Sequence, residues 1–461
     1  MPKQIYSNFL GGLSYYDRNA PANQYYEGRE IDPHRGRGYL QPGWLLSEIT
    51  KSTDSPQIID GTITDMCFDE DGSYLYFIDD NHLYKMIVST EAFDDDFDGA
   101  GNYYYAIPSA SQGYKLIVYN ISGTQYLFFA YKTATKGDVG TYDFGSTFNP
   151  DFFSTDVGAG ANDLEAAPMD MLVWKSYLFV SHGQYVARYD GANDTLAYHK
   201  LNLGKGWEIT KLFPTENYIG VCASRQITRT GHTEKTDSRV FFWDGSSIDW
   251  TYWKPISDWE ITTAINNEGT ILLFTEGKDF AGVVRELKEF GTKKRRKLKV
   301  PINGTMTEFG APNQNAVDVF GNRIVFGSEY LVFSYGQEED GQPMAITIPW
   351  GVAKATTINT ISAIKTVSDN KVYIAYTGNS GSTIYYLLKA NIGNSTRATY
   401  RGCYTDAGQK IRINYVKFYF KPLVSGDSVT VSLDTDYGTS NSLGTISYTA
   451  VSYTHLRAHE T

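Results

Sequence analysis

Short apolar runs of strand-forming residues recur along most of the chain at a nearly constant interval. The runs are rich in Leu, Ile, Val, Phe and Tyr, and neighbouring centres lie between 41 and 53 positions apart. Their centres are Leu75, Leu127, Leu178, Ile219, Leu272, Ile324 and Val372. A period of this length is typical of repeat proteins in which each unit is one small sheet.

Each centre is accompanied by further apolar runs that predict neighbouring strands. A run precedes every centre, at residues 63–68, 114–119, 169–174, 209–213, 261–265, 316–320 and 361–367. Turn-forming connectors such as Asp71-Gly72 and Ser122-Gly123 separate the two, which predicts antiparallel hairpins. A third run follows in six of the units, at residues 82–86, 184–189, 240–243, 283–287, 330–335 and 384–387.

This pattern predicts an all-β fold, a β-propeller over residues 45–400. A lone sheet of three or four strands cannot bury both of its faces, whereas radial stacking of several sheets covers them. The seven centres favour seven blades. Because Leu45 to Thr50 could add a closing strand to the last blade, six or eight blades stay open. A β-helix or a stacked sandwich is the competing all-β arrangement.

The segments on either side of the repeats differ from them. Residues 1–44 are rich in Gly and Pro without sustained periodicity, which predicts an extended N-terminal arm. Residues 401–450 return to alternation, with Val416, Phe418 and Phe420 on one face and Lys417 and Tyr419 on the other. We expect the start of a truncated C-terminal β-sandwich there.

Residues 451–461, Val-Ser-Tyr-Thr-His-Leu-Arg-Ala-His-Glu-Thr, resemble the translation of a sequencing-library adapter. Such an origin implies a metagenomic sequence whose natural C-terminus is missing. A processing scar is left out of fold reasoning. We therefore expect this tail to pack against nothing, and we exclude His455 and His459 from any metal site.

Composition and charge narrow the classes of function. Among 461 residues, 41 are Lys or Arg and 52 are Asp or Glu, giving a net charge of −11 that disfavours general binding to nucleic acid or anionic membranes. No apolar run approaches the roughly 18 residues of a membrane span, so no membrane insertion is expected. The three cysteines, Cys67, Cys222 and Cys403, lie too far apart to indicate a disulfide framework or a zinc knuckle.

One basic run contrasts with this acidic background, at residues 293–299. Its cations are Lys293, Lys294, Arg295, Arg296, Lys297 and Lys299. The alternation of Lys297, Leu298, Lys299 and Val300 favours an exposed edge strand guarded by lysines. Contact with nucleic acid or an acidic partner is the alternative interpretation.

The best candidate metal ligands are Asp94, Asp96, Asp98 and Asn102. Carboxylates at alternate positions before a glycine can converge on one Ca²⁺. The twelfth position of a helix-flanked calcium loop would be Tyr105, where that loop needs Glu. We therefore expect weak calcium binding at most, and favour a solvated acidic loop; no other cofactor is expected.

The sequence contains no nucleophile elbow, His-Glu-x-x-His or phosphate loop, which favours a protein that is not an enzyme. Paired carboxylates for glycoside chemistry are invisible in one sequence. Trp243, Trp250 and Trp253 could form a sugar-stacking face, although packing between blades is the favoured interpretation.

Several short sequence motifs resemble those of a family of phage proteins. The arm contains Asn8-Phe9-Leu10-Gly11-Gly12-Leu13-Ser14 and Arg37-Gly38-Tyr39-Leu40-Gln41-Pro42-Gly43. Blades carry Ala187-Arg188-Tyr189-Asp190-Gly191 and Phe242-Trp243-Asp244-Gly245, and Val416-Lys417-Phe418-Tyr419 follows the repeats. Together they resemble the β-propeller virion proteins of tailed bacteriophages, at the head-to-tail junction or tail, including the packaged-DNA stabilisation type.

The resemblance implies a viral structural protein of the neck or tail, a head-tail connector or tail component, assembled in the host cytoplasm into the virion. Its partners would be other virion proteins, or further copies in a ring or spike, and it carries over no active-site residue. The arm offers apolar and cationic side chains that a partner could bury. These are Phe9, Leu13, Tyr15, Tyr16, Tyr25, Tyr26, Arg35, Arg37 and Trp44. A carbohydrate-binding or glycoside-cleaving propeller is the alternative.

Overall fold

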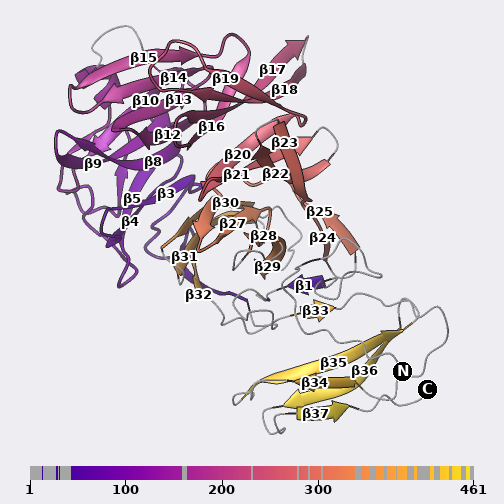
Figure 1. Cartoon of the computed structure of the whole chain (residues 1–461). Helices are drawn as coiled ribbons and strands as arrows, with labels where there is room; N and C mark the ends of the chain where they lie inside the picture. The colour runs from indigo at the N-terminus through magenta and orange to yellow at the C-terminus, as the bar shows by residue number, and fades with distance from the viewer. Residues whose placement is uncertain are drawn as a thin grey trace. The chain divides into compact units, whose positions relative to one another are not determined.

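A computed structural model places seven small sheets in a ring (Figure 1). It describes residues 13, 27–29, 31, 43–157, 164–229, 232–277, 280–288, 291–302, 305–337, 344–351, 360–367, 371–379, 382–391, 399–401, 416–419, 426–435, 439–447 and 453–456. Within these residues the structure is almost entirely strand, with one short π-helical turn, η1 (Phe152–Val157). The predicted all-β propeller is confirmed.

The first four blades follow one another along the chain. Blade 1 contains β3 (Asp65–Phe68), β4 (Tyr74–Ile78), β5 (His82–Ile87) and β6 (Ala92–Phe93), with β7 (Tyr104–Ala106) also on β5. Blade 2 contains β8 (Gln112–Ile121), β9 (Thr124–Lys132), β10 (Gly137–Tyr142) and β11 (Phe148–Asn149). Blade 3 contains β12 (Met169–Trp174), β13 (Tyr177–His182), β14 (Tyr185–Asp190) and β15 (Thr195–Asn202). Blade 4 contains β16 (Trp207–Pro214), β17 (Ile219–Arg229), β18 (His232–Trp243) and β19 (Tyr252–Ile256).

The last three blades complete the ring. Blade 5 contains β20 (Glu260–Asn267), β21 (Thr270–Gly277), β22 (Phe280–Lys288) and β23 (Gly291–Lys297). A hairpin of β24 (Lys299–Ile302) and β25 (Thr305–Glu308) leads to blade 6, with β26 (Val317–Phe320), β27 (Arg323–Ser328), β28 (Leu331–Gly336) and β29 (Ala345–Gly351). Blade 7 contains β30 (Thr360–Thr366), β31 (Lys371–Asn379), β32 (Thr383–Asn391) and, from the N-terminal side, β2 (Leu45–Lys51).

All seven predicted centres lie in the second strand of a separate blade, from Leu75 in β4 to Val372 in β31. The closing strand is also confirmed. β2 pairs antiparallel with β32, from Leu45 opposite Asn391 to Lys51 opposite Tyr386. An N-terminal strand thus completes the last blade, which decides between the six, seven and eight blades that the sequence left open.

The core lies between neighbouring sheets. Tyr119 of blade 2 meets Tyr189 of blade 3, and Phe179 of blade 3 meets Trp243 of blade 4, each pair edge to face. Phe274 of blade 5 likewise packs on Phe326 of blade 6. Each sheet buries its faces only against its neighbours, as radial stacking requires.

The described parts of the N-terminal arm lie along blade 6. The Leu13 amide donates to the Ile346 carbonyl, and the Trp44 amide donates to the Pro349 carbonyl, so both follow β29. Leu13, Ile31 and Trp44 are buried at 1–2% exposure. Strand β1 (Glu27–Arg29) pairs with β33 (Thr399–Arg401).

These contacts correct the expectation that Leu13 and Trp44 face a partner. Both are buried in apolar clusters of their own chain, Leu13 with side chains of blades 5 and 6 and Trp44 with side chains of blades 6 and 7. The other candidate partner residues, Phe9, Tyr15, Tyr16, Tyr25, Tyr26, Arg35 and Arg37, lie outside the described residues.

Residues 404–461 form a separate compact unit. Strand β34 (Val416–Tyr419) pairs with β37 (Tyr453–Leu456), and β35 (Ser428–Thr435) pairs with β36 (Thr439–Ser447). The predicted strands at 416 and 429 are therefore present. The expectation that residues 451–461 pack against nothing is wrong, because the Tyr453–Leu456 backbone completes the ladder of β34.

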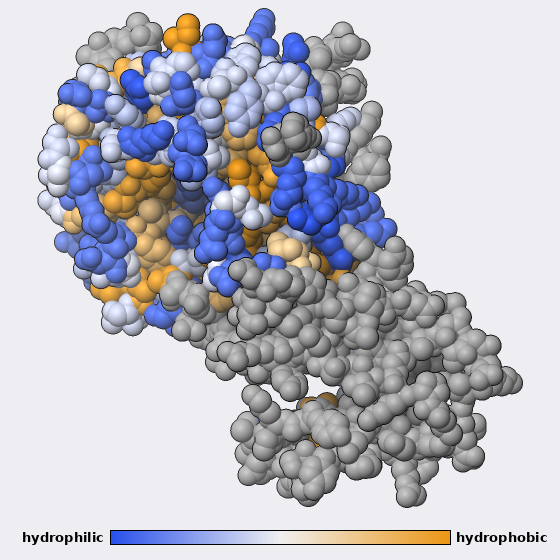
Figure 2. All heavy atoms as spheres, in the orientation of Figure 1, coloured by the Kyte–Doolittle hydropathy of each residue, from blue (hydrophilic) through white to orange (hydrophobic). Residues whose placement is uncertain are grey.

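Most of the basic run, from Lys293 to Lys297, lies in β23, the predicted edge strand on the outside of blade 5, whereas Lys299 begins β24. β23 pairs only with β22 among the described strands, and Lys293 and Lys294 are exposed on it. Arg295 pairs with Glu286, and both Lys297 and Lys299 pair with Glu308. Figure 2 shows strongly hydrophilic side chains over this part of the ring. No helix among the described residues is long and apolar enough to cross a membrane.

Candidate functional site

The tripeptide Asn313-Gln314-Asn315, just before blade 6, occupies the axis of the ring. The Asn315 side-chain amide donates to the carbonyls of Thr64 and Tyr114, each at 3.0 Å. The backbone carbonyl of Asn315 accepts from the Ile364 amide at 3.0 Å. One residue therefore joins blades 1, 2 and 7 through their innermost strands and the residues next to them.

The two preceding residues extend this plug. Gln314 donates through Nε2 to the Met169 carbonyl of blade 3, and its carbonyl accepts from Thr263 Oγ1 of blade 5. Asn313 donates through Nδ2 to the Ile361 carbonyl of blade 7. Hydrogen-bonded amides thus join blades 1, 2, 3, 5 and 7 at the middle of the ring.

Three aspartate–lysine pairs surround the plug, each joining the first strands of two consecutive blades. In each pair the aspartate accepts a backbone amide of the next blade through one oxygen and lies near that blade's lysine. The pairs are Asp65 with Lys115 (3.0 Å), Asp170 with Lys211 (3.3 Å) and Asp318 with Lys365 (3.6 Å). The amides belong to Leu116, Leu212 and Thr366, each at 2.8 Å.

The sequence patterns described above do not predict this arrangement. An Asp is the first or second residue of the inner strand in blades 1, 3 and 6, and a Lys follows 41 to 50 positions later in the next blade. That recurrence was a usable signal, because a charged residue inside a predicted buried strand needs a partner.

The two lysines that donate to Asn315, Lys115 and Lys211, have pKa values shifted in opposite directions. Burial opposes protonation of Lys115, but the Asp65 and Asp170 carboxylates outweigh it and raise the pKa of Lys115. At Lys211 the effect of burial outweighs the Asp170 and Asp65 carboxylates, so the pKa of Lys211 is lowered. Burial also raises the pKa of the nearby Cys67 thiol to about 11, so it is not a thiolate nucleophile at neutral pH.

An acid–histidine cluster lies on blade 1. His82 Nδ1 is 3.0 Å from Asp60 Oδ1 and 3.5 Å from Asp79 Oδ1. The Tyr84 hydroxyl donates to Asp79 Oδ2 at 2.6 Å. Asp60 comes from the connection before β3, whereas Asp79 lies in the β4–β5 turn.

These groups shift one another's ionisation. Burial opposes ionisation of Asp79, yet hydrogen bonds from His82 and Tyr84 outweigh it and lower the pKa of Asp79. Burial raises the pKa of Asp60. Burial opposes protonation of His82, but its hydrogen bond and charge interaction with Asp79 raise the pKa of His82. The cluster therefore favours an imidazolium held between carboxylates, or a cation in its place.

The predicted calcium loop is organised differently. Asp96 Oδ1 accepts from the Gly101 amide at 2.7 Å, and Asp98 Oδ1 accepts from the amides of Ala100 and Asn102. Asn102 Nδ2 donates to Asp98 Oδ2, and Asp94 pairs with Lys85. These carboxylates mainly hold the turn of their own loop.

They also do not converge. Among the residues that the structure describes, the only three His, Cys, Asp or Glu side chains with ligand atoms within 4.8 Å of one another are Asp60, Asp79 and His82. Calcium binding by Asp94, Asp96, Asp98 and Asn102 stays a prediction.

The three tryptophans do not share one face. Trp243 is fully buried between blades, and Trp250 packs edge to face on Phe241. Trp253 is 42% exposed and stacks on the Arg239 guanidinium at 4.0 Å.

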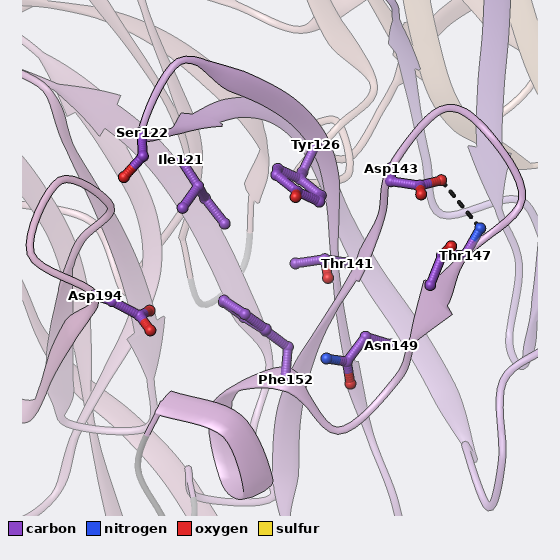
Figure 3. Close-up of a pocket in the computed structure, with 9 residues that line it drawn as sticks. All are labelled: Ile121, Ser122, Tyr126, Thr141, Asp143, Thr147, Asn149, Phe152 and Asp194. Carbon is purple, nitrogen blue, oxygen red and sulfur yellow. Dashed lines mark hydrogen bonds between the residues drawn. The ribbon is translucent and has the colours of Figure 1, made fainter.

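A cleft of about 420 Å³ opens between blades 2 and 3 (Figure 3). Its walls come from the β8–β9 and β10–β11 hairpins, from η1 and from the β14–β15 turn. The lining residues are Ile121, Ser122, Tyr126, Thr141, Asp143, Thr147, Asn149, Phe152 and Asp194. The cleft thus combines two aromatic rings with carboxylate, amide and hydroxyl groups.

Comparison with known proteins finds similarity of fold only. No protein-family model and no curated protein matches the chain. It is similar to the solved Dos1 propeller at 16% identity, covering 74% of this chain and 81% of that one, with a TM-score of 0.44. Raptor from Chaetomium thermophilum matches at 10% identity over 76% of this chain and 30% of that one, with a TM-score of 0.48. The N-terminal domain of Nup159 matches at 9% identity over 83% and 100%, with a TM-score of 0.41.

Proposed function

We propose that the protein is a non-enzymatic structural component of a tailed-phage particle, built into the neck or tail through protein–protein contacts. The observation that carries this proposal is the plugged axis. Asn313, Gln314 and Asn315 form hydrogen bonds to six other blades, which stiffens the ring.

A rigid ring suits assembly because an incoming subunit meets a surface that is already ordered. Leu13, Ile31 and Trp44 anchor the arm on blade 6. Tyr15, Tyr16, Tyr25 and Tyr26 between the anchors offer large apolar bodies that a neighbouring subunit could bury. Arg35 and Arg37 could pair with its carboxylates.

The test is co-expression with the capsid, portal and tail proteins encoded beside its gene, followed by purification of particles. The variant Arg35→Glu/Arg37→Glu keeps the blade 6 anchors, so we expect an unchanged thermal midpoint and loss of incorporation into particles. Lys205→Glu, at an exposed lysine between blades 3 and 4, is the matched charge reversal and should incorporate normally. Equal incorporation of both variants would refute the arm contact, and neighbouring genes unrelated to phage would refute the class.

Carbohydrate binding is a second candidate, supported by the cleft between blades 2 and 3. The Tyr126 and Phe152 rings border it, and Asp143 and Asp194 supply acceptors for sugar hydroxyls (Figure 3). Aromatic faces beside hydrogen-bonding groups are typical of binding sites for polar, ring-shaped ligands.

Saturation-transfer NMR against glucose, galactose and N-acetylglucosamine oligomers tests this candidate. Binding that is lost in Tyr126→Ala and kept in Tyr252→Ala, an exposed tyrosine of blade 4, would support it. Absence of transfer from every oligomer would exclude these sugars.

A further inference from the structure

We propose that Asp60, Asp79 and His82 bind one divalent transition-metal ion through an imidazole nitrogen and two carboxylates. This proposal is independent of the phage role. An ion with bonds of about 2.1 Å spaces neighbouring ligand atoms by about 3.0 Å in an octahedron and about 3.4 Å in a tetrahedron. His82 Nδ1 lies 3.0 Å from Asp60 Oδ1, which matches the octahedral spacing, and one ligand atom from each of the three residues lies within 4.8 Å of the other two.

The fold holds the deepest ligand firmly. Asp79 is fully buried, and its Oδ1 accepts from the backbone amides of Asn81 and His82 at 3.0 and 2.7 Å. Its Oδ2 accepts from the Tyr84 hydroxyl and keeps a second lone pair for an ion. Such partners around a carboxylate orient it as a metal ligand.

A glycine allows the third ligand to come close. A Cβ on Gly61 would lie 2.9 Å from Asp79 Oδ2, so a side chain there would push the backbone away. With glycine, the chain passes directly over the Asp79 carboxylate and carries Asp60 to the imidazole. The Asp60 side chain is 47% exposed, which leaves an entry path for an ion and room for water ligands.

The charge of the cluster is unbalanced without a cation. Asp60, Asp79 and the neighbouring Asp80 carry three carboxyl groups against one imidazole, and no lysine or arginine pairs with any of them in the described part of the chain. A divalent ion would supply the missing charge.

The donor set selects the class of metal. Imidazole nitrogen favours transition metals over Ca²⁺ and Mg²⁺, while carboxylates suit Mn²⁺, and Zn²⁺ accepts both donors. We therefore expect Mn²⁺ and Zn²⁺ to bind, and Co²⁺ to report the site by its visible absorption.

The experiment is calorimetric titration of the untagged, EDTA-treated full chain with MnCl₂ and with ZnCl₂, together with absorption spectra in CoCl₂. We expect one ion per chain that depends on this cluster. Asp60→Asn changes an exposed carboxylate with no backbone partner in the described structure, so it should fold normally and weaken binding at least about tenfold. His82→Gln should do the same and abolish the cobalt bands.

Asp71→Asn, at an exposed carboxylate in the β3–β4 turn of the same blade, is the matched control and should bind Mn²⁺ like the unmodified chain. If His82→Gln does not fold, Asp60→Asn decides alone. Absence of Mn²⁺ and Zn²⁺ binding up to millimolar concentration, or equal affinity in Asp60→Asn and the unmodified chain, would overturn the proposal.

Discussion

Lys115 and Asn315 lie 200 positions apart in the sequence, yet Lys115 Nζ donates to Asn315 Oδ1 at 3.1 Å on the axis of the ring. The same amide donates to two backbone carbonyls, so it satisfies three polar groups at once. The contact shows that a polar residue links several blades at the centre of this propeller.

Asn315→Ala should therefore lower stability more than any exposed amide substitution. It leaves the Thr64 and Tyr114 carbonyls and the Lys115 ammonium without this partner, at a cost of about 2–4 kcal/mol. Thermal unfolding followed by circular dichroism measures the effect. Asn193→Ala, at an exposed turn of blade 3, is the control, and equal midpoints for the two variants would contradict the axial role.

Asp170→Ala should be destabilising by about 3 kcal/mol, because it leaves Lys211 buried without its carboxylate. The double variant Asp170→Ala/Lys211→Met removes both charges and should recover part of that loss. Urea unfolding of the two single variants and the double variant gives the coupling. Purely additive effects would show that the pair does not act as a unit.

His182 should make the protein less stable in mild acid. Burial lowers the pKa of His182 to about 4, from an ordinary value of 6.5. Its Nδ1 accepts from the Glu165 amide and its Nε2 faces the Tyr198 carbonyl, so only the neutral ring fits both contacts.

The unfolded chain takes up a proton near pH 6.5, whereas the folded chain does so only near pH 4. Stability is therefore lost as pH falls between these values, by about 3 kcal/mol for this group. His182→Gln can keep both hydrogen bonds without titrating. Urea midpoints at pH 7 and pH 4.5 should move closer together in this variant, and an unchanged difference would assign the acid sensitivity to other groups.

Trp44→Ala should destabilise the ring by about 3–5 kcal/mol, because its buried indole packs edge to face on Phe320 beside the closing strand. Trp253→Ala, at a half-exposed ring of blade 4, should change the midpoint far less. Calorimetry compares the two. Similar midpoints would return Trp44 to the candidates for partner contact.

The local patterns determined the repeat. The strands around Leu75, Leu127 and the other centres could be predicted because alternation and turn residues are signals that act within a few positions. Each blade is also a run of consecutive hairpins, so its pairing partners are neighbours in the sequence. The lysine-guarded strand at 291–297 was predictable for the same reason, since edge protection is written into one segment.

Contacts between distant segments were decided only by the closure of the ring. Asn315 became the axial hub because radial stacking brings together segments with no sequence relationship. From the sequence, Leu13 and Trp44 were predicted to contact a partner, whereas the fold buries both within their own chain. A large hydrophobic side chain indicates that it will be buried, but only the tertiary structure determines which residues cover it.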